Sequence, residues 1–194
     1  MIGTVPMNRF APLDYRCALD AARTLFEPRA TPLVCCHVPE LAAEAAQRFT
    51  RQPNTAIVDG VVWVEPLIPT WRAELASITG KLSVGATLTV IASQPLAWII
   101  PERRMWSGQP LGMQLVGKQK LWWALRRSGF TIDATYGFHS VSSIMLSQVS
   151  QQAARWGRPD ISDRLHFLAR LHYCVQGPTT ALATVALVVA RKKQ

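Results

Sequence analysis

Residues 61–93 read VVWVEPLIPTWRAELASITGKLSVGATLTVIAS, and this stretch decides the fold. It continues a β-rich run over 55–67 that is typical of a strand covered on both faces in a parallel sheet. A helix follows from about residue 70, with apolar side chains at helical spacing, and a turn at 83–85 leads into a strand over 86–92. Strand, helix and strand in this order predict a βαβ unit with a right-handed crossover.

Upstream of this unit the pattern predicts a helix, a strand and a second helix. Apolar side chains repeat at helical spacing over 14–27, and Asp14 is expected to cap the start of that helix. The apolar run at 32–36 indicates a short buried strand, and Pro39 opens a helix that continues to Phe49.

Downstream, the stretch 94–117 is rich in proline and glycine and is expected to form an irregular surface excursion or lid. Regular structure then returns as a helix over 118–128 ended by Gly129, a strand over 130–136, a helical region over 141–173 broken near 157–159, and a last strand over 182–190.

Three pieces carry a family resemblance: residues 61–93, LWWALRRSGFTIDATYGF (121–138) and TVALVVARKK (184–193). In this order they resemble the C-terminal half of class I S-adenosylmethionine (SAM) dependent methyltransferases, from the fourth strand to the last. The resemblance implies an α/β fold with a single Rossmann-like sheet of methyltransferase type. That sheet is mostly parallel, has an antiparallel last strand beside strand six, and carries helices on both faces.

A chain of 194 residues is long enough for one domain with a full core. We therefore expect a single methyltransferase-like domain over 1–194, with an atypical N-terminal half (1–54) and a distal half (55–194). The distal half includes the irregular excursion at 94–117 and a helical insertion at 141–173.

The N-terminal half lacks what the resemblance implies for binding SAM. In the family the first strand runs into a glycine-rich turn, where the absence of a side chain lets the backbone approach the cofactor. This chain has no glycine between Gly3 and Gly60. LVCCHVPELAAEAA (33–46) resembles the family's second strand and its helix, so the acid that binds the ribose hydroxyls would fall on Cys36, a weak hydrogen-bonding group. Asp59 resembles the family's later acidic contact with adenine, or else forms a strand kink with Gly60.

Two residues are candidates for catalysis. Glu65 ends the fourth strand, where the resemblance implies catalytic or substrate-contacting residues and where doubly wound sheets bind ligands. His139 follows strand six and is a candidate general base, with a satisfied surface histidine as the alternative. Cys35, Cys36 and His37 are consecutive, so on a strand they alternate between faces and predict buried thiols rather than a metal site.

The charge balance is strongly basic. Lysine and arginine number 21 against 12 acids, which gives a formal charge of +9 and favours an acidic partner. Bases and tryptophans alternate in one region and are our candidates for partner binding: Arg103, Arg104, Trp106, Lys118, Lys120, Trp122, Arg126 and Arg127. Such a surface suits nucleic acid, an anionic membrane face or an acidic protein, although no nucleic-acid motif is present. A solvated basic helix is the alternative.

The chain shows no sign of membrane insertion or secretion. No apolar run reaches eighteen residues, and Asn8, Arg9, Asp14 and Arg16 interrupt the apolar core that a signal peptide needs. We therefore expect a cytoplasmic protein.

The leading hypothesis is a non-catalytic pseudoenzyme without a cofactor, which acts as a binding or assembly protein with a protein partner or a second copy of itself. One alternative is a SAM-dependent methyltransferase of a small molecule with an atypical cofactor site. The other is a basic module that binds nucleic acid or an anionic surface.

Overall fold

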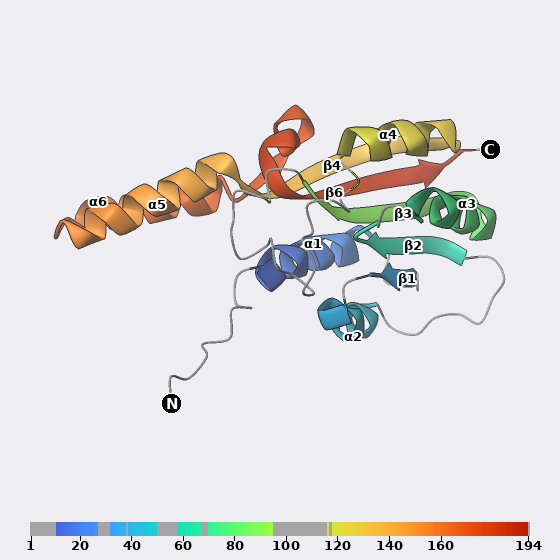
Figure 1. The fold of residues 1–194 in the computed structure, drawn as a ribbon, viewed down its shortest axis with the longest axis horizontal. Helices are drawn as coiled ribbons and strands as arrows, with labels where there is room; N and C mark the ends of the chain where they lie inside the picture. The colour runs from blue at the N-terminus through green and yellow to red at the C-terminus, as the bar shows by residue number, and fades with distance from the viewer. Residues whose placement is uncertain are drawn as a thin grey trace.

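A computed structural model describes residues 11–26, 32–37, 39–49, 58–66, 70–94, 116 and 118–193. They form one mixed sheet of six strands with helices around it (Figure 1). The elements in chain order are α1 (Ala11–Leu25), β1 (Leu33–Cys36), α2 (Pro39–Arg48), β2 (Val58–Val64), α3 (Trp71–Lys81), β3 (Leu82–Ser93), α4 (Lys118–Arg127), β4 (Phe130–Ser140), α5 (Val141–Arg155), α6 (Pro159–Leu171), β5 (Cys174–Gln176), the 3₁₀ helix η5 (Gly177–Leu182) and β6 (Ala183–Lys192).

The sheet has the topology that the resemblance implies. Its strand order is β1-β2-β3-β6-β4-β5, with β1, β2 and β3 parallel to one another. The last strand, β6, lies between β3 and β4 and is antiparallel to both, so β4 runs in the same direction as β3. The predicted α/β class with a mostly parallel Rossmann-like sheet is confirmed.

The position of β1 corrects one prediction. A doubly wound sheet has the order 3-2-1-4-5-6, in which the first strand lies beside the fourth. Because β1 pairs directly with β2, residues 33–36 take the place of the first strand and not of the second. Cys36 therefore ends the strand that runs into the glycine-rich turn in the family.

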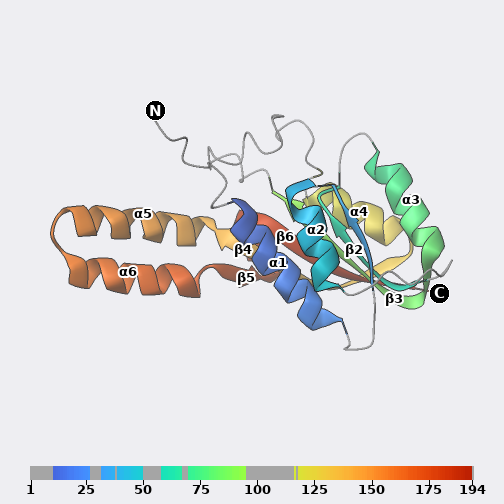
Figure 2. The ribbon, with the colours of Figure 1, turned by 90° about the horizontal axis from the view of Figure 1, so that it is seen from below.

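Helices cover both faces of the sheet, with α1 and α2 on one face and α3 and α4 on the other (Figure 1, Figure 2). Side chains of β2 alternate between the two layers, as the pleat of a strand requires. Val62 and Val64 pack in the layer of α1, whereas Val61 and Trp63 pack in the layer of α3. This double burial explains the continuous apolar run that predicted the strand.

The turn expected at 83–85 is a bulge within β3. The register with β2 shifts between Val58, which faces Leu82, and Gly60, which faces Thr87, so extra residues of β3 loop out there. Gly85 takes a φ of 81° in this bulge. The excursion at 94–117 lies outside the described residues apart from Gln94 and Val116.

The helical region expected at 141–173 is an antiparallel pair, α5 and α6, which projects from the sheet in both views (Figure 1, Figure 2). Ser140 caps α5 by accepting a hydrogen bond from the Ser143 amide at 3.2 Å. The Ser143 hydroxyl donates to the Ala169 carbonyl at 2.8 Å and ties the two helices together. None of the helices in the described part of the chain is long and apolar enough to cross a membrane.

Candidate functional site

The carboxyl ends of β1, β2, β3 and β4 meet at one edge of the sheet, because these four strands share a direction. Cys36, Glu65, Gln94 and His139 lie at these ends. Open sheets of this kind bind their ligands at this edge, so it is the candidate site. The structure thus places Glu65, His139 and Cys36 at the same edge.

Glu65 is held by groups of the protein itself. Its side chain is buried, and one carboxylate oxygen accepts hydrogen bonds from the Tyr15 hydroxyl and from the Ser93 amide, the latter at 3.0 Å. The other oxygen, Oε1, is buried and has no hydrogen-bond partner among the described residues. The backbone of Glu65 has a φ of 56°, a strained conformation for a residue with a side chain.

Burial sets the protonation of this pair. Burial raises the pKa of Glu65 above its ordinary value, although hydrogen bonds from Tyr15 and Ser93 oppose the rise. Burial and the neighbouring Glu65 carboxylate raise the pKa of Tyr15 well above 10.0, so the phenol keeps its proton and donates. This pairing could not be predicted from the sequence, because Tyr15 occupies an ordinary core position of an amphipathic helix.

This raised pKa predicts a pH dependence for Glu65→Gln. Glutamate in the unfolded chain has a pKa of about 4.3, and the pKa of Glu65 in the folded chain is higher. Between these two pKa values the folded chain keeps a proton that the unfolded chain has lost. The stability contributed by the wild-type carboxyl therefore falls as the pH rises above about 4.3. The glutamine variant has no such proton. The difference between its free energy of unfolding and that of wild type should therefore shift in favour of the variant as the pH rises, which urea titrations at several pH values would measure.

Glu44→Gln provides the control for this experiment. Burial alone would raise the pKa of Glu44, but hydrogen bonds from Arg16 and Arg48 outweigh it and hold that pKa below its usual value. The control should therefore show the opposite and smaller trend: the free energy of unfolding of Glu44→Gln should fall relative to that of wild type as the pH rises. Parallel curves for Glu65→Gln and wild type across the range would contradict the assignment.

A second polar cluster surrounds Asp14, which is buried in the first turn of α1. The carboxylate accepts hydrogen bonds from the Tyr173 hydroxyl and, at 3.2 Å, from the Thr184 hydroxyl, and it lies 3.1 Å from His139 Nδ1. The prediction that Asp14 caps this helix is wrong, because α1 begins at Ala11. Asp14 instead joins α1 to β4, β6 and the segment after α6.

His139 belongs to this cluster. Its backbone has a φ of 55°, its ring stacks on Tyr173 with centroids 5.6 Å apart, and its amide donates to the Tyr173 carbonyl at 2.8 Å. The imidazole is therefore engaged with Asp14 and Tyr173 at the edge of the sheet.

His37 is engaged on the α3 side of the same edge. Its Nε2 lies 2.7 Å from Glu74 Oε2, and the Trp63 indole donates to the same oxygen at 3.2 Å. The Thr70 hydroxyl donates to the other oxygen of Glu74 at 2.7 Å. The sequence did not single out Glu74. Its contacts with His37 and Trp63 connect the end of β1 and β2 to the start of α3.

Asp59 does not join the candidate site. It is exposed near the start of β2, six residues from Glu65, which corresponds to roughly 20 Å along a strand. Its carboxylate accepts a hydrogen bond from the Ser83 hydroxyl at 2.9 Å, beside the bulge of β3. The reading of Asp59 as part of a strand irregularity agrees with this position. Within the described residues, no three acids, histidines or cysteines are placed to hold a metal ion.

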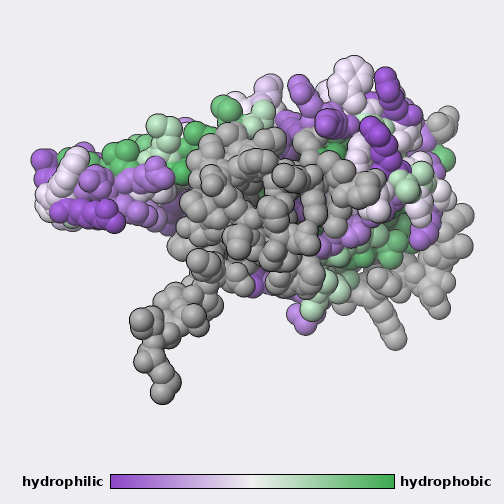
Figure 3. All heavy atoms as spheres, viewed as in Figure 1, coloured by the Kyte–Doolittle hydropathy of each residue, from purple (hydrophilic) through white to green (hydrophobic). Residues whose placement is uncertain are grey.

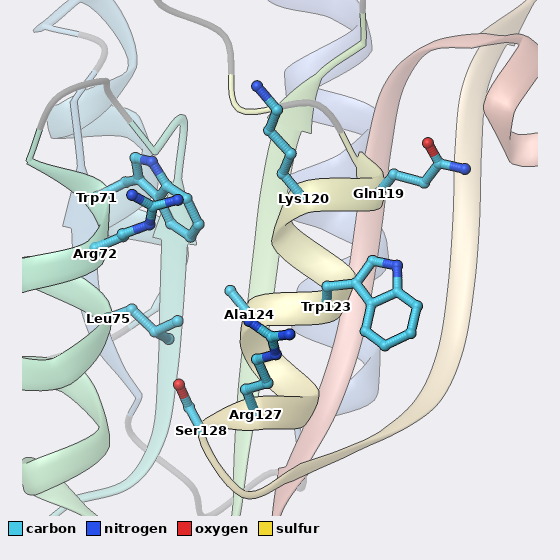
Figure 4. Close-up of a pocket in the computed structure, with 9 residues that line it drawn as sticks. All are labelled: Trp71, Arg72, Leu75, Gln119, Lys120, Trp123, Ala124, Arg127 and Ser128. Carbon is cyan, nitrogen blue, oxygen red and sulfur yellow. The ribbon is translucent and has the colours of Figure 1, made fainter.

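The predicted partner-binding residues of α4 divide between two sides of the helix. Lys118 donates to the Thr180 hydroxyl, and the Arg126 guanidinium lies 3.8 Å from the centre of the Trp122 ring. Lys120 and Arg127 instead line a groove between α4 and α3 (Figure 4). Arg103, Arg104 and Trp106 lie outside the described residues.

Comparisons with known proteins give a match in structure but not in sequence. No family model and no curated protein matches this chain. A SAM-dependent methyltransferase from Thermotoga maritima, described as a possible histamine N-methyltransferase, superposes with a TM-score of 0.59 at 13% identity, covering 96% of this chain and 92% of its own. A candidate methyltransferase from Bacillus halodurans C-125 gives a TM-score of 0.51 at 10% identity, covering 94% and 100%. The fold of this chain is that of the class I SAM-dependent methyltransferases.

Proposed function

We propose that this chain is a non-catalytic methyltransferase-like domain that acts as a binding or assembly protein. One observation carries the proposal: helix α1 fills the carboxyl edge of the sheet with its own side chains. Tyr15 binds Glu65 and Ser93 there, and Asp14 binds His139 and Thr184. The carboxylate of Asp14, the hydroxyl of Tyr15 and the imidazole of His139 are thus engaged within the protein, whereas Glu65 Oε1 and Gln94 Nε2 are buried at this edge without a hydrogen-bond partner among the described residues.

The residues around β1 do not fit an adenosyl cofactor. The strand in first position ends at Cys36, and His37 and Val38 follow it before α2 begins at Pro39, so each residue of this connection carries a side chain. A close approach of backbone to cofactor needs glycine at such a turn. These features support the loss of the cofactor site.

Isothermal titration calorimetry with S-adenosylhomocysteine, the product form of the cofactor, tests the proposal. We expect no heat beyond dilution at millimolar ligand. Saturable binding at micromolar concentration would overturn the proposal and support the alternative below. Circular dichroism of the same sample verifies that the protein is folded.

The alternative is a SAM-dependent methyltransferase of a small molecule, and backbone strain at the edge favours it. Glu65 and His139 are the two residues other than glycine with a positive φ in the described part of the chain, and both end strands of the sheet. Strain of this kind concentrates at functional sites. Methyl transfer depends mainly on positioning, so a weak set of acids and bases is compatible with it.

The hairpin of α5 and α6 supplies a surface for assembly. Large apolar side chains are more than half exposed at Met145 and Val149 on α5, at Trp156 directly after α5, and at Phe167 and Leu171 on α6. Met145 and Val149 are four residues apart, so they lie on one stripe of α5. Figure 3 shows a band of hydrophobic side chains along one edge of the hairpin and hydrophilic ones along the other.

We propose a second copy of the chain as the occupant of this surface. Two antiparallel helices with one apolar face form half of a four-helix bundle, and a two-fold axis lets the same face of two copies cover each other.

Val149→Glu tests the hairpin as a dimer interface. Wild type should sediment as a dimer at micromolar concentration, and the variant should weaken dimerisation at least about tenfold because it buries a charge in an apolar contact. Gln151→Glu is the matched control, since it is exposed and lies 200° further round the same helix. A monomeric wild type, or equal effects of the two substitutions, would contradict the assignment.

A further inference from the structure

A basic groove lies between α3 and α4, on the opposite face of the sheet from α1. It has a volume of about 670 Å³ and is lined by two tryptophans and three cations: Trp71, Trp123, Arg72, Lys120 and Arg127. No carboxylate is among the described residues that line it. Figure 4 shows Lys120 and Arg127 on α4 and Arg72 on α3 around the space between the helices.

The helical repeat explains how α4 presents this surface. Lys120, Trp123 and Arg127 are three and four residues apart, so their side chains share one face of the helix. The buried residues Leu121 and Leu125 face the sheet and fix that orientation. Trp123 keeps 61% of its surface exposed, an unusual position for an indole that contributes nothing to the core.

The opposite wall of the groove is preorganised by α3. Trp71 is buried, and the Arg72 guanidinium lies 5.1 Å from the centre of its ring, a cation–π contact that holds the arginine beside the groove. Glu74, the acid of α3, is engaged with His37, Trp63 and Thr70 at the sheet edge. These contacts hold the Glu74 carboxylate away from the groove, whose lining does not include it.

The geometry points to single-stranded nucleic acid as the ligand of this groove. Phosphates bind Arg72, Lys120 and Arg127, and a base stacks on the exposed face of Trp123. An open groove with cations along a backbone path and an exposed indole is how proteins bind unpaired strands. Nucleic acid accounts for both features, because its phosphates suit the cations and its bases suit the exposed indole.

This inference does not depend on the loss of the cofactor site. The groove is built from α3 and α4, whereas the candidate site at the sheet edge is covered by α1. A negative result for the groove therefore does not bear on the loss of the cofactor site, and a negative result for the cofactor site does not bear on the groove.

Fluorescence anisotropy with a labelled oligothymidine of about twelve nucleotides tests the inference on the full chain. We expect saturable binding that weakens steeply as salt rises. Trp123→Ala should weaken binding about tenfold through the loss of stacking. Arg127→Glu should weaken it by a similar factor and lower the slope of affinity against salt by at least about one. Both side chains are exposed, so the two variants should have the same melting temperature as wild type.

Arg155→Glu is the matched control, because it makes the same change of net charge on α5, at the other end of the molecule (Figure 1, Figure 2). It should change the affinity by less than about twofold. Equal weakening by Arg155→Glu and Arg127→Glu, or no effect of Trp123→Ala, would overturn the groove as the site. A poly-glutamate peptide that binds as tightly as the oligonucleotide would overturn nucleic acid as the ligand, as would a lack of binding by wild type.

Discussion

Replacing Asp14 by alanine should lower the free energy of unfolding by about 3 kcal/mol, measured by urea denaturation. The buried carboxylate is the common acceptor for the Tyr173 and Thr184 hydroxyls and the partner of His139. Its removal leaves buried donors without an acceptor, and each such donor costs free energy. The loss should also loosen the contact of α1 with β4 and β6.

Asp20→Ala is the control for this substitution. Asp20 lies on the same helix and pairs with Arg48 at 2.7 Å, but its side chain is 63% exposed. Exposed ion pairs contribute little, so the expected change is below about 1 kcal/mol. An Asp14→Ala variant as stable as Asp20→Ala would show that the cluster does not hold α1 on the sheet.

Substitution of Gly137 by alanine should cost about 2 kcal/mol of folding free energy, because overpacking a tight contact forces the backbone to shift. A Cβ atom at this position would lie 2.6 Å from the Cβ of Ala183 and 3.0 Å from the Cα of Thr180. These are parts of β6 and η5 that cannot rotate away. Gly137 thus lets η5 pack closely on β4 beside the base of the α5–α6 hairpin.

Gly80→Ala should stabilise the protein, whereas Gly137→Ala should destabilise it. A Cβ at Gly80, inside α3, would meet no atom within 4 Å, and alanine is the better helix former by about 1 kcal/mol. Thermal and urea unfolding of the two variants should therefore move in opposite directions. A stabilised Gly137→Ala variant would contradict the packing described for β4 and η5.

The parts of the fold that the sequence predicted are those that depend on local pattern. The apolar run of β2, the helical spacing of α3 and the glycine that ends α4 are each visible within a few residues. Because these elements follow one another as strand, helix and strand, their order alone indicated a doubly wound sheet. The antiparallel position of β6 came from the resemblance and agrees with the observed pairing.

The parts that the sequence could not give depend on contacts between distant residues. Tyr15 and Glu65 are 50 residues apart, and Asp14 and Tyr173 are 159 apart. In the sequence Asp14 has the type and place of a helix cap, and Tyr15 has those of a core residue. Only the packing of α1 across the sheet turns them into the groups that fill its carboxyl edge. Likewise, β1 reads as a strand but its neighbour in the sheet cannot be read from four residues.

The candidate surfaces show the same division. The sequence singled out Lys120, Trp122 and Arg127 by composition, but treated the basic helix as one surface. The packing of α4 against the sheet separates Trp122, which stacks with Arg126, from the residues that face α3. Trp123 was not among the partner-binding candidates, because the sequence alone does not show which of two adjacent tryptophans is exposed.

We propose that α1 fills the carboxyl edge of this sheet and that no adenosyl cofactor binds there. The most direct measurement follows the backbone amide resonances of His37, Glu65 and Gln94, one from each of the three parallel strand ends, while S-adenosylhomocysteine is added to the labelled protein. We expect these resonances to keep their positions up to millimolar ligand. Shifts that saturate at micromolar ligand and are confined to these strand ends would contradict it.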